Sequence, residues 1–147
     1  MKNQLLFFIT AVSIYSSPLL FAQSDLRVKS PDPEIIQKLE EIVRIYELRV
    51  DTEQLKWEMG TGEHLIEAKI ELTEAIIELE REKRRPDAVI AEMKRLVSLC
   101  QKRLNREMAL YEREQHLSED ELAEMKLDLL RAEVQLLRAE KDSLSIP

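Results

Sequence analysis

The sequence predicts an all-α protein made of two tandem antiparallel helical hairpins, which form either a four-helix bundle or an elongated coiled-coil-like array. Only two glycines and five prolines interrupt the whole chain. Beyond the N-terminal segment, no run of β-branched or aromatic residues alternates with polar ones, as it would in a strand. Apolar residues recur instead at intervals of three and four, which is the spacing of a helix that packs against another helix.

Two stretches of the chain match each other at a shift of 54 residues. The matched positions are Ile36, Leu39, Val43, Tyr46, Val50, Glu53 and Trp57 in the first copy and Ile90, Met93, Val97, Cys100, Leu104, Glu107 and Tyr111 in the second. The helices that follow, with seams starting at Leu65 and Leu122, match at a shift of 57. The three additional residues fall in the second turn, where insertions are tolerated. The pattern predicts a duplicated hairpin, and such a repeat indicates architecture better than chemistry.

The N-terminal segment has the features of a secretory signal peptide. Lys2 precedes an apolar run over residues 5–21, and small residues suited to cleavage follow at Ala22 and Ser24. A retained membrane anchor is the alternative, but the run is short for a span and ends without a cluster of positive charges. We therefore expect residues 1–24 to be removed during export, which predicts secretion across the inner membrane and a periplasmic location.

The mature chain of about 125 residues is long enough for one domain. The sequence has 22 basic and 29 acidic residues, and loss of the signal peptide removes only Lys2, which leaves a net charge of about −8. Such a chain repels nucleic acid and anionic lipid, and its charges are interleaved as on a solvated helical surface. We expect no nucleic-acid partner and no membrane span after removal of the signal.

Turn and capping residues divide the mature chain. Asp32 before Pro33 predicts the start of the first helix, because aspartate caps free amides and proline suits the first helical position. Gly60 to Gly62 predicts the first reversal, and Ser118 with Glu121 forms a capping box at the last helix. The predicted segments are a flexible linker over 25–31, a helical domain over 32–142 with repeats 32–84 and 86–142, and a short tail over 143–147. The predicted helices cover about 33–59, 63–83, 87–114 and 118–141.

The first and third helices carry more apolar residues than one seam requires. The additional residues are Ile35, Ile42 and Leu48 in the first and Val89, Leu96 and Leu99 in the third. Both helices are therefore predicted to contact more than one partner. A closed bundle would meet that need within the chain, whereas two hairpins side by side would leave an apolar edge for another copy.

Four seam positions are candidate partner or register positions: Glu53, Trp57, Glu107 and Tyr111. The glutamates could form hydrogen bonds across the helices and set their register. The interpretation we favour is that they lie near a splayed end where water reaches them. The two aromatic residues are predicted to anchor the core, with partner contact as the alternative.

Other residues give weaker signals. Cys100 is the single cysteine and is predicted to be a buried apolar filler, with an intermolecular disulfide as the alternative. His64 and His116 each precede a glutamate by three residues, the reverse of the order in helical di-iron sites, so we expect no metal site. Basic residues near residue 84 indicate a helix end, with docking of an acidic partner as the alternative.

No nucleophile motif, phosphate-binding loop or paired-cysteine site is present in the sequence. We therefore predict no catalytic residues, no cofactor and no enzyme. A metal-dependent enzyme is disfavoured because no ligand constellation occurs.

The segments from Leu55 to Leu72 and from Leu110 to Glu133 resemble the helix-turn-helix repeats of TolC-like outer-membrane efflux proteins. In that family an aromatic residue, a spacer, a glycine turn and a leucine-alanine helix recur in two repeats. The present chain has Glu114 in place of the second glycine and lacks the strands that form a membrane barrel in that family. The resemblance implies a periplasmic helical-hairpin protein associated with export or efflux machinery.

A second resemblance leads to a different function. Leu117 to Glu121 is similar to the leucine-threonine, two-spacer, glutamine motif of periplasmic chaperones and stress or metal sensors of the CpxP/Spy kind, with serine and glutamate at its polar positions. The first hypothesis is an exported non-enzymatic protein that acts through helix-helix contacts with a protein partner or with itself. The alternative is a chaperone or sensor of this second kind.

Overall fold

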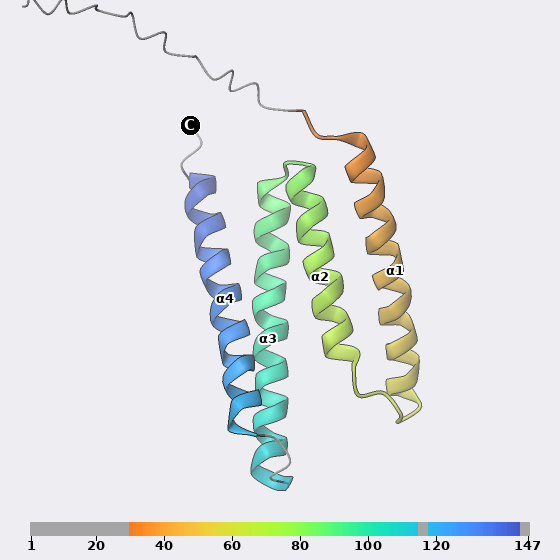
Figure 1. Ribbon diagram of the computed structural model, residues 1–147, viewed down its shortest axis with the longest axis vertical. Helices are drawn as coiled ribbons and strands as arrows, with labels where there is room; N and C mark the ends of the chain where they lie inside the picture. The colour runs from red at the N-terminus through yellow and green to blue at the C-terminus, as the bar shows by residue number, and fades with distance from the viewer. Residues whose placement is uncertain (1–29, 115–117, 145–147) are drawn as a thin grey trace, which may run out of the picture.

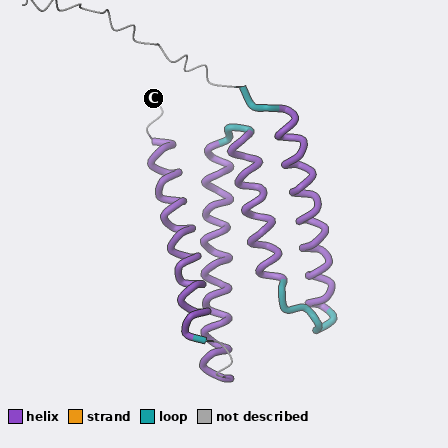
Figure 2. Tube along the Cα trace, in the orientation of Figure 1, coloured by secondary structure: helices purple, strands orange, loops and turns teal. Residues whose placement is uncertain are grey.

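The computed structural model describes residues 30–114 and 118–144, and this part of the chain is all-α with no strand (Figures 1 and 2). The helices are α1 (Pro33–Glu58), α2 (Leu65–Glu82), α3 (Pro86–Glu114) and α4 (Glu119–Leu144). The predicted fold class is confirmed, and α4 continues two residues past the predicted end of the helical domain. The predicted signal peptide, residues 25–29 of the linker and the second turn at 115–117 lie outside the described residues.

The four helices form an open antiparallel row. Each helix packs against its neighbour in the chain, so that α2 contacts α1 and α3, and α3 contacts α2 and α4. Within the described residues, α1 has no Cα within 8 Å of a Cα in α3 or α4. Figure 1 shows the same order, with α1 and α4 at opposite edges. Of the two predicted alternatives, the structure has the array and not the closed bundle, because a closed bundle would bring α1 and α4 together.

Two of the predicted helix starts, those of α1 and α4, are confirmed by their hydrogen bonds. Asp32 accepts a hydrogen bond at Oδ1 from the backbone N–H of Glu34 at 3.0 Å, and Pro33 is the first residue of α1. The Ser118 backbone N–H donates to Glu121 Oε2 at 2.8 Å, and the Glu121 N–H donates to Ser118 Oγ at 3.2 Å. The bonds from Ser118 hold the pKa of Glu121 below its ordinary value. Both starts depend on contacts within a few residues, so sequence patterns could locate them.

The turn between α1 and α2 needs its two glycines for different reasons. Gly60 has φ = 75°, the left-handed conformation that closes a helix, and space around it is open. At Gly62 the requirement is space, because a Cβ there would lie 2.4 Å from the backbone nitrogen of Trp57. The backbone at Gly62 therefore passes directly over the end of α1.

Two buried clusters hold the row together. One joins α1 to α2 through Val43, Leu72, Ala75 and Leu79. The other joins α2, α3 and α4, and its buried residues are Ile77, Val89, Met93, Leu96, Cys100, Leu104, Leu129 and Ala132. The buried pairs Leu72 and Leu129, and Ala75 and Ala132, are 57 residues apart, so the predicted repeat shift describes positions with the same packing role.

The prediction that both α1 and α3 contact more than one partner is correct for α3 and wrong for α1. Val89, Leu96 and Leu99 are buried in α3, whereas Ile42 and Leu48 in α1 are exposed. The second helix with two neighbours is α2 and not α1, and in α2 Thr73 and Ile77 are buried in addition to the predicted seam. Their spacing, with Ile66 and Ile70 before them, forms a second seam on α2. This three-four spacing is the sequence signal that could have shown that α2 packs against two helices.

We predict that Gly62→Ala destabilises the protein more than Gly60→Ala. Gly60→Ala should cost about 1–2 kcal/mol in the free energy of unfolding, which is the penalty of placing a residue with a Cβ in the left-handed conformation. Gly62→Ala should cost more, because its Cβ would meet backbone atoms of α1 that cannot rotate aside, and the turn would have to move away from the helix. Urea unfolding followed by circular dichroism would measure both variants, and equal losses of stability would contradict this account of the turn.

Candidate functional site

The end of α1 presents three large apolar side chains to solvent. Leu55 is 61% exposed, Trp57 is 59% exposed and Met59 is 71% exposed. We call these three residues the α1 tip. They lie where α1 ends and the chain turns toward α2, at the lower end of the row in Figure 1. Leu55 and Met59, four residues apart, lie on one side of the helix, and Trp57, two residues from each, lies on the other side. The end of α1 thus exposes large apolar groups on two sides, and exposed apolar surface of this kind occurs at protein contact sites.

The predicted core role of the two aromatic residues is wrong for Trp57. Its side chain is mostly exposed, although it occupies a seam position in the last turn of α1. Tyr111, its counterpart in the repeat, is partly buried on α3. The two residues belong to helices that do not touch, so the structure does not bring them together.

The favoured interpretation of Glu53, a residue near a splayed end that water reaches, is also wrong. Glu53 is only 8% exposed, and Lys56 one turn further along α1 donates to its Oε1 at 2.6 Å. This hydrogen bond lowers the pKa of Glu53, and it outweighs the opposing effect of burial. Lys56 lies in the same helix as Glu53, so this bond satisfies the carboxylate without setting the register between helices.

Glu107, the equivalent residue of α3, is partly buried. Its Oε1 lies 3.8 Å from Nε of the adjacent Arg106, whose Nη1 donates to the carbonyl of Glu63 at 3.0 Å. Arg106 thus links α3 to the loop before α2. In each repeat, the glutamate that interrupts the apolar seam therefore lies near a basic side chain: Lys56 for Glu53 and Arg106 for Glu107.

Cys100 is buried in the cluster that joins α2, α3 and α4, as predicted. Burial is the main cause that raises the pKa of its thiol, with a further contribution from the negative charge of Asp128. The thiol therefore stays protonated and has little access to a second chain. The structure favours the filler interpretation over the intermolecular disulfide.

His64 is exposed at the start of α2 and makes no capping hydrogen bond through its side chain, while His116 lies outside the described residues. Across residues 30–114 and 118–144, no three histidine, cysteine, aspartate or glutamate side chains are grouped so that they could hold a metal ion.

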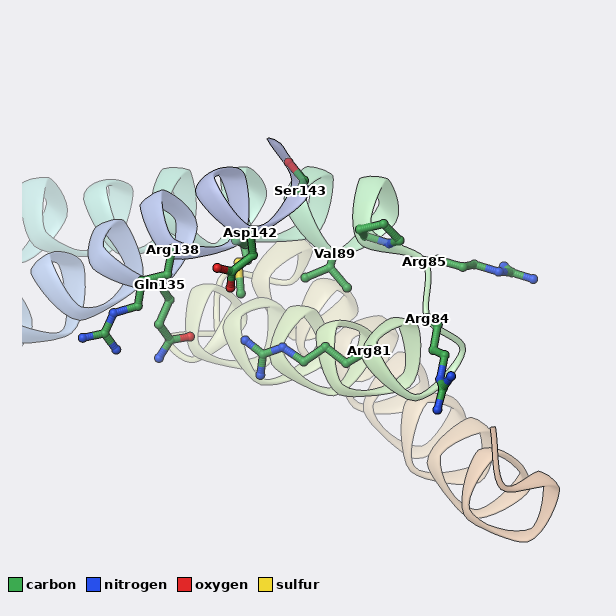
Figure 3. Close-up of a pocket in the computed structure, with 11 residues that line it drawn as sticks. Arg81, Arg84, Arg85, Val89, Gln135, Arg138, Asp142 and Ser143 are labelled. Atoms are coloured by element: carbon green, nitrogen blue, oxygen red, sulfur yellow. The ribbon is translucent and has the colours of Figure 1, made fainter. Parts of the chain in front are cut away.

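The basic residues at the end of α2 line a hollow of about 680 Å³ with residues from the end of α4. Arg81, Arg84, Arg85 and Arg138 contribute to it, together with Asp142. Figure 3 shows that Arg84 and Arg85 extend away from Asp142, in different directions from Arg138. Because the guanidinium groups do not converge on one point, the hollow is not a formed anion site.

A groove of about 510 Å³ follows α3 between α2 and α4. Its charged lining residues carry both signs and are Glu74, Glu78, Asp128, Arg81, Arg103 and Arg131. Burial, and then the charge of Asp128, raise the pKa of Glu74. Arg103 lies 3.7 Å from Glu67 of α2 and 3.6 Å from Asp128 of α4, so one guanidinium links the three helices across the groove.

Comparisons with protein-family models, with curated proteins and with solved structures gave no significant match. In the described part of the chain, no helix combines the length and apolar character needed to cross a membrane. The geometry of the exposed helix faces is therefore the basis for the functional proposal.

We predict that Glu53→Gln makes the protein less stable at pH 7 but not at low pH. The folded-state pKa of Glu53 lies below its ordinary value of 4.5. The stabilisation is therefore present above that value and is lost as the pH falls through the folded-state pKa. Urea midpoints of the variant and the natural chain should differ at pH 7 and converge as the pH is lowered toward about 3.

Glu47→Gln is the matched control for this prediction, because Glu47 is an exposed glutamate on the same helix. Its difference from the natural chain should be small at both pH values. A difference for Glu53→Gln that stays the same from pH 7 to pH 3 would show that the lysine bond does not contribute in the way proposed.

Proposed function

We propose that this protein is exported to the periplasm and acts without catalysis, by binding a helical protein partner of the cell envelope through the α1 tip. The observation that carries the proposal is that Leu55, Trp57 and Met59, on two sides of the end of α1, are all exposed at one end of the row. Tryptophan contributes strongly to protein interfaces, because it has a large apolar surface and few rotatable bonds.

The form of the row supports the proposal. The α1–α2 turn and the end of α3 both lie at the same end of the molecule, which leaves the α1 tip at an extremity of an elongated shape (Figure 1). A partner can reach that end without displacing a helix of the row. The apolar composition of the tip suits a groove between the partner's helices, and the charges nearby on α1 suit a polar rim around such a contact.

The export part of the proposal is supported by the N-terminal sequence. Residues 5–21 are apolar and are followed by small residues, and the sequence after them is rich in charge, as in a protein that leaves the membrane after cleavage. The resemblance of the turn regions to TolC-like hairpins supports export or efflux machinery as the location of the partner.

We predict that a photo-reactive amino acid at Trp57 forms an adduct with one partner protein in the cell envelope. The same group at Glu47, on an exposed part of α1 away from the tip, is the control and should form no such adduct. Leu55→Glu should abolish the adduct at Trp57, because a charge would have to enter an apolar contact. N-terminal sequencing of the exported chain would show whether cleavage occurs near Ala22 or Ser24.

The absence of an envelope adduct at Trp57 in cells that contain the exported chain would contradict this function. A chaperone of the CpxP/Spy kind gives a different result, since an unfolded client would produce a broad set of adducts. Suppression of client aggregation that survives in Leu55→Glu would also favour the chaperone over a specific partner.

A further inference from the structure

The contact between α2 and α3 is the one interface of the row that joins the two hairpins. Ile77 of α2 lies in the same buried cluster as Val89 and Leu96 of α3, and Ile70 packs against it. Thr73, on the same face of α2, is fully buried. The two contacting surfaces are here called the α2 face and the α3 face.

The repeat places an equivalent of the α2 face on α4. At the shift of 57, the residues that correspond to Ile66, Ile70, Thr73 and Ile77 are Ala123, Leu127, Leu130 and Val134. The last three of these are 44%, 55% and 45% exposed. Together they form a three-four seam on the side of α4 that does not pack against α3, so this apolar surface has no partner among the described residues of its own chain.

An equivalent of the α3 face lies on α1. At the shift of 54, the residues that correspond to Val89, Leu96 and Leu99 are Ile35, Ile42 and Ile45. The three residues of α3 are buried, whereas their three equivalents in α1 are between 41% and 60% exposed. Each edge of the row therefore exposes one half of an interface that is buried in the middle.

The charges follow the same repeat. Arg103 of α3 lies near Glu67 of α2 on one side and Asp128 of α4 on the other. Its equivalent in α1 is Arg49, which forms an ion pair with Glu71. Glu71 is the equivalent of Asp128 at the shift of 57, so Arg49 reproduces one of the two contacts that Arg103 makes.

The second contact is missing in one copy of the chain. The equivalent of Glu67 at the shift of 57 is Glu124 on α4, at the opposite edge of the row from Arg49. Among the residues that the structure describes, Glu124 forms no ion pair. If α1 of a second copy packed against α4, its Arg49 would approach Glu124 as Arg103 approaches Glu67.

We propose that α4 of one copy packs against α1 of a second copy, so that the interface between α2 and α3 is repeated between molecules. The apolar seams and the arginine-glutamate pair both complement each other in this arrangement, and the alternating direction of the helices continues across the junction. The contact is head-to-tail, so it forms a closed ring or an open filament according to the rotation between copies. It uses Ile35, Ile42 and Ile45 and not the α1 tip, so it does not depend on the proposed function.

Charge reversal tests the arrangement in the purified mature chain. Arg49→Glu places two carboxylates at every junction, and Glu124→Arg places two guanidinium groups there. Each variant alone should lose at least about tenfold in association constant, because like charges would face each other across an apolar contact. An equimolar mixture of the two variants should regain the mass of the natural assembly in light scattering, since every mixed junction again pairs opposite charges.

Apolar variants provide a second measurement. Ile42→Glu on α1 and Leu130→Glu on α4 should each reduce the assembly to monomers, since a head-to-tail junction needs both faces. Leu55→Glu is the matched control: it changes an exposed leucine on α1 whose equivalent, Ala109, is exposed on α3, and it should leave the mass unchanged. Circular dichroism would show that all variants remain helical.

Several results would overturn the proposal. One is a monomeric natural chain at a concentration of about 0.1 mM, where an interface of ordinary strength would be occupied. A mixture of the charge variants that stays monomeric is another. Loss of assembly in Leu130→Glu but not in Ile42→Glu would indicate a symmetric contact between two α4 helices instead.

Discussion

The packing of α2 between α1 and α3 is the contact on which the rest of the row depends. Because α1 packs against no other helix of the described chain, its apolar tertiary contact comes from α2, through the cluster that contains Val43 and Leu72. The opposite side of α2 provides Ile77 to the cluster that holds α3 and α4. A helix of 18 residues, the shortest of the four, thus presents apolar surface on two sides.

Polar contacts follow this central packing and align the helices along their length. Lys83 donates to Glu40 at 2.7 Å, and Glu82 accepts from the backbone N–H of Asp32 at 3.1 Å, so the end of α2 is tied to α1. On the other side, Arg103 links α2 to α4 through the groove. These pairs are partly exposed, so each contributes little to stability, but their positions distinguish one alignment of neighbouring helices from another.

Predictions from the sequence were accurate where a few adjacent residues decide the outcome. The caps at Asp32 and Ser118 were located correctly, because each depends on a side chain and an amide within three residues. The burial of Cys100 was also predicted, since the three-four pattern identifies the inner side of a helix. The exposure of Trp57 was not predicted, because its seam position does not reveal whether the neighbouring helix extends far enough to cover it.

The sequence by itself determined four helices, the starts of α1 and α4 and the duplication of a hairpin, because periodicity and capping within each segment decide them. Only the tertiary structure decided that the row stays open and that Ile42 and Leu130 remain exposed at its edges. A wide apolar helix such as α1 can bury its second side within the chain or keep it for another molecule. The choice depends on whether the first and last helices meet, and no local pattern contains that information.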